Sequence, residues 1–185
     1  MDENLTNDIT LELARLHVLR GIDFTRQLRL IVNRKEFRPV EGLTGVFTAI
    51  GPSDEDYPAL INAARRAVMH GFQVYILPNP KGIRTADFIF VRKGVYRMYD
   101  LKTVQGKSSI LNRLVESIGQ TNHVLLNMAT DYNARLLGLQ IQKYFEWNPD
   151  AAQILIFKGN KMLSVTRRML NDRNFIPRFT ILYNK

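Results

Sequence analysis

Two aspartates and a lysine in the middle of the chain could together hold and use a metal ion. Residues 85–103 read TADFIFVRKGVYRMYDLKT, with β-branched and aromatic side chains on both sides of Lys93-Gly94. A two-residue hairpin loop at Lys93-Gly94 would set Asp87 opposite Asp100 on paired strands. Both carboxylates would then leave the same face. Lys102 follows Asp100 by two residues, so the period of a strand places its ammonium on that face too.

Two carboxylates and an amine on one face suit metal-assisted hydrolysis of a phosphodiester. Carboxylate oxygens are preferred ligands of Mg²⁺, which polarises the phosphate and lowers the pKa of a bound water. A nearby lysine can orient that water or offset the charge that develops on the phosphate. The same residues also suit ordinary structural roles: Asp-x-Lys at a strand end is usually a solvated pair, and Asp87 could be an edge-strand charge that discourages aggregation. A three-residue loop would instead send the two carboxylates to opposite faces.

Composition indicates a soluble globular chain with an excess of basic residues. The 185 residues are 45% hydrophobic and 23% charged, enough for one domain with a sizeable core. A net charge of +9 favours a polyanionic partner, either nucleic acid or an anionic membrane surface. The absence of cysteine excludes a disulfide framework and a thiolate metal site. The start, MDENLTND, is acidic, and no later run is long enough for a membrane span, so we expect no signal peptide, no membrane insertion and a cytoplasmic site of action.

Hydrophobic periodicity predicts a helical N-terminal part. Residues 4–20 repeat apolar side chains at the helical period, and a second helix is predicted around Leu28. The basic residues near this second helix could clamp a nucleic-acid backbone, although the solvated face of an amphipathic helix is the more usual role of such a run. Residues 39–52 are rich in Gly and Pro and are predicted to form a loop with at most one short strand at 46–50. The basic residues are Arg26, Arg29, Arg34, Lys35 and Arg38.

The middle of the chain is predicted to run helix, strand, strand, strand, helix, strand. Ser53 and Asp56 form a capping box that opens the first helix. The helix that follows Ser109 crosses over so that the last strand can join the sheet. The predicted strands are residues 72–77, the two arms of the hairpin in 85–103, and residues 124–128.

The start of the crossover helix offers further contacts for nucleic acid. Lys107 and Ser108 would direct positive charge and amide donors towards an anion beside Lys102. A simple serine cap accounts for the serines equally well. Arg113, on the polar face of the same helix, completes the candidate nucleic-acid-binding residues.

The last third of the chain is predicted to add a helix, a second hairpin, a short basic helix and an edge strand. We expect one globular domain overall, in which residues 1–52 form a helical subregion packed on a core of residues 53–185. The predicted elements are a helix at 131–146, hairpin strands at 152–157 and 162–165, a helix at 167–173 and a strand at 179–183.

These motifs, in this order, resemble the PD-(D/E)xK nuclease superfamily. Asp87 is followed by the triplet Asp100-Leu101-Lys102 inside a helix, three strands, helix, strand arrangement. More narrowly, residues 63–128 look like the C-terminal tRNA nuclease domains of contact-dependent growth inhibition proteins and their phage and mobile-element relatives. The stretches that support this are His70-Gly71-Phe72-Gln73-Val74, Thr85-Ala86-Asp87-Phe88, Tyr99-Asp100-Leu101-Lys102-Thr103, Ser109-Ile110-Leu111-Asn112-Arg113-Leu114 and Val124-Leu125-Leu126.

The resemblance implies a mixed α/β (α+β) fold, with a restriction-endonuclease-like core of order αβββαβ, N-terminal helices and a C-terminal β-hairpin extension. It implies that Asp87 and Asp100 bind Mg²⁺, or Mn²⁺ or Zn²⁺, and that Lys102 assists the attacking water. Gln120 matches a polar position on the crossover helix near the site. The implied function is a divalent-metal-dependent endonuclease of the toxin type, acting on RNA such as tRNA rather than DNA, with an immunity protein as a possible partner.

The sequence departs from the family pattern at two places, and the missing glutamate motivates an alternative function. Ala86 stands where the family has a proline, and the first core helix carries Asn62, Arg65 and Arg66 where many relatives have a glutamate. One alternative is therefore a catalytically inactive nuclease fold that serves as a nucleic-acid-binding or protein-interaction module. Another is a DNase of the restriction or repair type.

Overall fold

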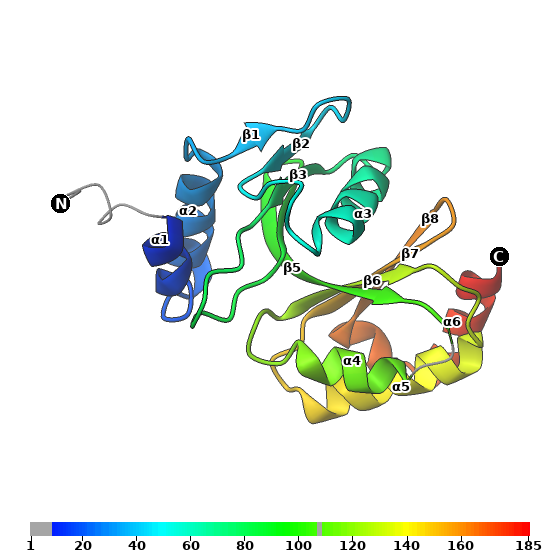
Figure 1. Ribbon diagram of the computed structural model, residues 1–185. Helices are drawn as coiled ribbons and strands as arrows, with labels where there is room; N and C mark the ends of the chain where they lie inside the picture. The colour runs from blue at the N-terminus through cyan, green and yellow to red at the C-terminus, as the bar shows by residue number, and fades with distance from the viewer. Residues whose placement is uncertain (1–8, 107–108) are drawn as a thin grey trace. The chain divides into compact units, whose positions relative to one another are not determined.

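The computed structural model describes residues 9–106 and 109–185 (Figure 1). The described residues form eight strands, six α-helices and a 3₁₀-helix, which confirms the predicted α/β class. The chain divides into two compact units, residues 1–98 and 99–185. Each unit buries a hydrophobic cluster of its own. No helix within the described ranges is both long enough and apolar enough to cross a membrane.

The first unit joins two N-terminal helices to short strands and a third helix. Strand β1 pairs antiparallel with β2, β2 pairs parallel with β3, and β3 pairs antiparallel with β4. Leu28 and Ile31 of the second helix are completely buried, as the helical period predicted. The elements are α1 (Ile9–Arg15), α2 (Gly21–Val32), β1 (Arg38–Pro39), β2 (Val46–Thr48), α3 (Tyr57–Met69), β3 (Gln73–Ile76) and β4 (Phe88–Arg92).

The predicted two-residue hairpin loop is confirmed. Strand β4 ends at Arg92 and β5 (Val95–Val104) begins three residues later. Lys93 has φ 51° and Gly94 has φ 76°. Positive φ at both central residues is the signature of a type I′ turn, whose twist matches that of the paired strands.

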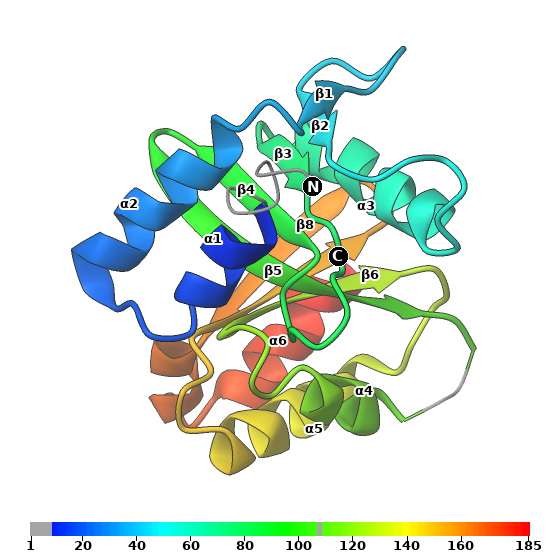
Figure 2. The same cartoon turned by 60° about the vertical axis from the view of Figure 1, so that its left-hand side comes forward.

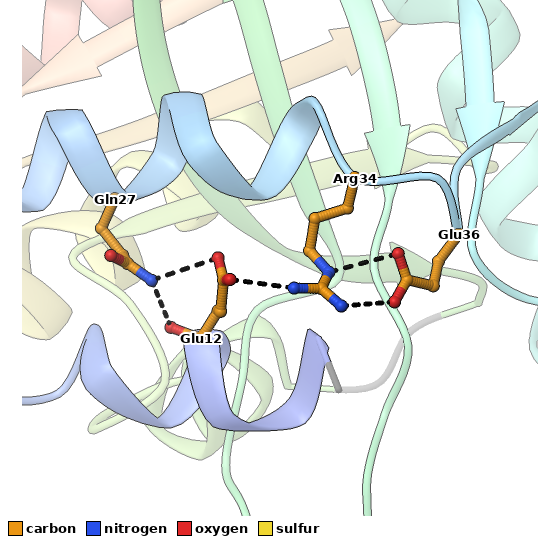
Figure 3. Close-up of polar contacts among 4 residues, drawn as sticks. All are labelled: Glu12, Gln27, Arg34 and Glu36. Atoms are coloured by element: carbon orange, nitrogen blue, oxygen red, sulfur yellow. Dashed lines mark hydrogen bonds and ion pairs between the residues drawn. The ribbon is translucent and has the colours of Figure 1, made fainter. Parts of the chain in front are cut away.

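The predicted basic run at α2 includes one arginine that is bound by the unit's own carboxylates (Figure 3). The Arg34 guanidinium lies 2.9 Å from Glu12 of α1 and 2.5 Å from Glu36. Gln27 of α2 donates to the Glu12 main-chain oxygen at 3.2 Å. The hydrogen bonds that Arg34 donates to Glu36 and Glu12 raise the pKa of Arg34, and the bond to Glu36 lowers the pKa of Glu36. Arg34 therefore ties α1 to the segment after α2 and is not a solvated member of a basic clamp.

The second unit is a sheet whose helices lie on one side. From Val104 onwards the hydrophobic cluster combines one face of the strands with all three α-helices, which Figures 1 and 2 show on the same side of β5–β8. Strands β5 and β6 are parallel, β6 and β7 are parallel, and β7 and β8 are antiparallel. The elements are α4 (Ile110–Glu116), β6 (His123–Met128), α5 (Ala134–Trp147), β7 (Gln153–Lys158), β8 (Lys161–Thr166), η2 (Arg167–Asn171) and α6 (Phe175–Asn184).

The chain order α3, β3, β4, β5, α4, β6 is the predicted order of helices and strands. The parallel pairing of β5 with β6 confirms that α4 acts as a crossover, and β7 with β8 forms the predicted C-terminal hairpin. Helix α1 ends at Arg15, before the predicted end at residue 20, and the predicted start at residues 4–8 lies outside the described residues.

Two sequence predictions are wrong. Residues 179–183 belong to helix α6 and not to an edge strand, because Phe175, Phe179 and Tyr183 recur every four residues and are buried together. Ser53 does not cap α3, which begins at Tyr57 after Asp56. The segment before α3 forms a turn instead, in which the Asp54 carboxylate accepts from the main-chain N–H of Asp56 at 2.9 Å.

Candidate active site on strand β5

The register of β5 directs Asp100 and Lys102 towards the helices of the second unit. Val104 lies in the hydrophobic cluster with residues of α4 and α5. Alternate residues of a strand share a face, so Asp100 and Lys102 face the same way as Val104. The sequence prediction that Asp100 and Lys102 share a face is thereby confirmed.

Lys102 and Asp100 form a largely buried ion pair. The Lys102 Nζ atom lies 3.1 Å from Asp100 Oδ2, and the side chains are 15% and 5% exposed. A charge taken out of water needs partners to offset the lost hydration. The pair therefore holds one positive and one negative group at a defined separation under the helical layer.

Ser117 supplies a second partner for Asp100, and sequence reasoning did not find it. Its Oγ donates to Asp100 Oδ2 at 2.5 Å, and the residue is completely buried. A signal was present in the sequence: Ser117 follows Ile110 and Leu114 at helical spacing, so a hydroxyl stands where an apolar residue is expected. A polar residue at such a position indicates a buried partner, although the period alone does not say which one.

Glu116 places a second carboxylate near the ammonium. Its Oε2 atom lies 4.0 Å from Lys102 Nζ, and the side chain is 67% exposed. An exposed pair at this distance contributes little to stability. Lys102 is thus held by Asp100 on its buried side and approached by Glu116 from the solvent side.

The negative charge of Asp100 also acts on Tyr144 of helix α5. Burial raises the pKa of the Tyr144 phenol, and the Asp100 carboxylate adds to the rise. The phenol stays neutral near pH 7 and accepts from the Asn148 side chain at 3.1 Å. The surroundings of Asp100 therefore combine neutral polar groups with a close cation, Lys102.

Asp87 belongs to the first unit. It lies directly before β4, is half-buried, and its main-chain oxygen accepts from the N–H of Leu77 at 2.8 Å. That bond continues the pairing of β3 with β4 by one step and fixes the backbone at this position. Its assignment as a metal ligand stays a prediction from the sequence.

Gln120 and Arg113, the other predicted site residues that the structure describes, contact main-chain oxygens. Gln120 lies in the turn after α4, where its Nε2 is 3.5 Å from the main-chain oxygen of Glu116. Arg113 donates to the main-chain oxygen of Thr103 at 2.6 Å, so its guanidinium braces α4 against β5. Lys107 and Ser108 lie outside the described residues.

The donor set around Asp100 fits a hard cation held by few protein ligands. Within residues 9–106 and 109–185, no three His, Asp or Glu side chains gather into a metal-binding group. Mg²⁺ is commonly held by one or two carboxylates, with waters and substrate phosphates completing its shell, so such a group is not required. The Ser117 hydroxyl donates to Oδ2 of Asp100, and the Lys102 ammonium lies 3.1 Å from the same oxygen.

Comparisons with known proteins give one distant structural similarity. No protein-family model matches the chain, and no curated protein matches it. A solved structure described as a CdiA-CT/CdiI toxin and immunity complex from Burkholderia pseudomallei matches with a TM-score of 0.40 and 12% identity. The match covers 63% of this chain and 92% of that one. A similarity of this size assigns neither a family nor a function.

Proposed function

We propose that this protein is a divalent-metal-dependent endonuclease that hydrolyses phosphodiester bonds of nucleic acid. The observation that supports this most strongly is the Asp100 and Lys102 pair, in which a buried carboxylate and an ammonium lie 3.1 Å apart on one face of β5. An acidic metal ligand beside a lysine suits metal-assisted phosphodiester hydrolysis, because the metal would polarise the phosphate and the lysine would offset developing negative charge.

Each residue has a role in this proposal. Asp100 would hold the metal through Oδ1, and Asp87 is the predicted second ligand. The bound Mg²⁺ would polarise the phosphate and lower the pKa of a water. The Lys102 ammonium would donate a hydrogen bond to the attacking water or to a phosphate oxygen, and so stabilise negative charge as it develops.

The proposed substrate is RNA, with tRNA as the leading candidate. A net charge of +9 supports a nucleic-acid partner in general. The preference for RNA rests on the resemblance of the sequence motifs to toxin-type tRNA nucleases. Under that proposal an immunity protein is the expected protein partner, and the toxin acts in the cytoplasm of its target cell.

A cleavage assay with matched variants tests the proposal. The purified chain is incubated with tRNA, single-stranded DNA and duplex DNA, each in Mg²⁺ and in EDTA. We expect cleavage of tRNA in Mg²⁺ only, and a loss of at least about 100-fold in Asp87→Asn, Asp100→Asn and Lys102→Met. Asp150→Asn, which removes an exposed carboxylate from the second unit, is the control and should cleave like wild type. Full activity in all three site variants would refute the assignment.

One observation favours a second candidate, an inactive nuclease fold that binds nucleic acid. Helix α3 contains no acidic residue between Tyr57 and Met69, whereas many nucleases of the resembled type carry a glutamate there. Under this alternative the chain binds tRNA with an affinity that falls steeply with salt, yet leaves it intact in Mg²⁺ and Mn²⁺. Cleavage of duplex DNA in preference to tRNA would instead indicate the DNase alternative. The same assay therefore separates all three.

A further inference from the structure

We propose that Ser117 is a positioning residue, which holds the Asp100 carboxylate in the orientation that presents Oδ1 to the metal. The inference rests on the proposed function, because it concerns how Asp100 acts as a ligand. It assigns a role to a residue after the crossover helix that the family resemblance does not include.

The contact between Ser117 and Asp100 is short and shielded from water. The Oγ to Oδ2 distance is 2.5 Å, Ser117 is fully buried, and Asp100 is 3% exposed. Hydrogen bonds to a charged acceptor are shorter and stronger than neutral ones. The serine main chain is fixed as well, because its N–H donates to the oxygen of Leu114 at the end of α4. The hydroxyl oxygen therefore has a defined position relative to β5.

A second donor acts on the same carboxylate oxygen. Lys102 Nζ lies 3.1 Å from Oδ2, so one oxygen of Asp100 receives both contacts. A carboxylate held in this way cannot rotate about its terminal torsion without losing both bonds. Because the Ser117 hydroxyl donates to Oδ2, we assign the metal contact to the other carboxylate oxygen, Oδ1. Partners of this kind orient a metal ligand and commonly change affinity by about 10–100-fold when removed.

Packing alone does not account for a serine at this position. Ile110 and Leu114 precede it on the buried side of α4, and both are completely buried. A hydroxyl buried there costs free energy unless it is hydrogen-bonded, so an apolar side chain would suit the core better. The Asp100 carboxylate is the hydrogen-bond acceptor that offsets this cost.

Manganese binding by the full chain, without nucleic acid, tests the inference. Isothermal titration with Mn²⁺ compares wild type, Ser117→Ala and Ser117→Cys, whose thiol is a weak donor of similar size. We expect Kd to rise by about 10–100-fold in Ser117→Ala and by less in Ser117→Cys. Ser164→Ala is the matched control: it removes a hydroxyl of the same unit that accepts from Gln153 at 2.7 Å, and its Kd should equal that of wild type.

The outcomes separate this inference from the proposed function. Wild-type Mn²⁺ binding together with unchanged Kd in both Ser117 variants would overturn the positioning role and leave the endonuclease proposal standing. An absence of Mn²⁺ binding by the wild type would refute the metal-dependent function itself, and the positioning role with it. If Ser117 had only a structural role, Ser117→Ala would unfold at a lower temperature. Its Kd for Mn²⁺, measured while the variant is still folded, would equal that of wild type. If Ser117→Ala does not fold, Ser117→Cys decides between these outcomes.

Discussion

The ammonium of Lys102 contacts the carboxylate of Asp100 two residues earlier on the same strand, and both side chains lie largely out of water. Removing the cation leaves a buried carboxylate that still accepts from the Ser117 hydroxyl at 2.5 Å but has lost its close positive charge. We therefore expect Lys102→Met to lower the free energy of unfolding by about 3 kcal/mol, because Asp100 loses its partner but not its burial. Urea denaturation measures the change.

The double variant Asp100→Asn/Lys102→Met provides the control for this ion pair. It removes the charge together with its partner, so it should recover part of the loss seen in Lys102→Met. Lys185→Met, at an exposed position, should stay within about 0.5 kcal/mol of wild type. A double variant less stable than Lys102→Met would contradict the expectation. Cleavage assays of Lys102→Met belong at a temperature where this variant is folded.

Low pH is expected to destabilise the folded first unit by protonating Glu36. The Arg34 guanidinium, by donating hydrogen bonds, lowers the pKa of Glu36 below its ordinary value of 4.5. A depressed pKa means that the unfolded state binds more protons as the pH falls. The stabilisation is thus fully present above the ordinary pKa and is lost as pH falls through the lowered one. We expect Glu36→Gln to be less stable than wild type at pH 7, with a difference that shrinks between about pH 5 and pH 3.

Thermal unfolding of both proteins across this pH range measures the effect. Glu41→Gln replaces an exposed carboxylate near the same segment and should leave the pH dependence of wild type unchanged. A difference between wild type and Glu36→Gln that is constant from pH 7 to pH 3 would show that the Arg34 contact does not stabilise the charged form.

The parts of the fold that sequence could predict depend on local chemistry. Lys93-Gly94 specifies its turn because glycine takes positive φ without cost, and the strand period then places Asp100 and Lys102 on one face. The crossover between β5 and β6 follows from the order of elements, since parallel neighbours need a long connection.

The parts that sequence could not predict depend on which elements pack together. Residues 179–183, FTILY, suit a strand by propensity, and their helical state follows from the burial of Phe179 and Tyr183 beside α5. The hydrogen bond from Ser117 to Asp100 depends on the packing of α4 against β5, which no local sequence pattern predicts. The sequence therefore predicts Asp87 and Asp100 as candidate ligands, but it does not predict that the Ser117 hydroxyl donates to Asp100.

The planar guanidinium of Arg167 is predicted to stabilise the C-terminal end of α5 by donating hydrogen bonds to main-chain oxygens. The guanidinium donates to the main-chain oxygens of Phe145 at 3.1 Å and Ala151 at 3.1 Å, and also to that of Asn148. These carbonyls lie at or just beyond the end of the helix, where no helical N–H follows to satisfy them. Arg167→Lys keeps the charge but not the planar fork, so we expect a loss of about 2 kcal/mol.

Chemical denaturation compares Arg167→Lys with Arg168→Lys, whose side chain is exposed and serves as the control. The Arg168 variant should be indistinguishable from wild type. Equal stability of the two variants would mean that the carbonyls after α5 find water as readily as they find the guanidinium.

Gly138, in the middle of α5, is predicted to be required by the close packing of α6. A Cβ atom at this position would lie 3.0 Å from Cδ1 of Phe179 and 3.2 Å from Cδ1 of Ile176. Glycine to alanine inside a helix normally stabilises by about 1 kcal/mol, but overpacking costs about 1–3 kcal/mol. We expect Gly138→Ala to lower the unfolding free energy, and Gly138→Ala/Ile176→Val to recover part of it by removing the Cδ1 contact. A gain in stability for the single variant in urea denaturation would show that α6 can move away from α5 at little cost.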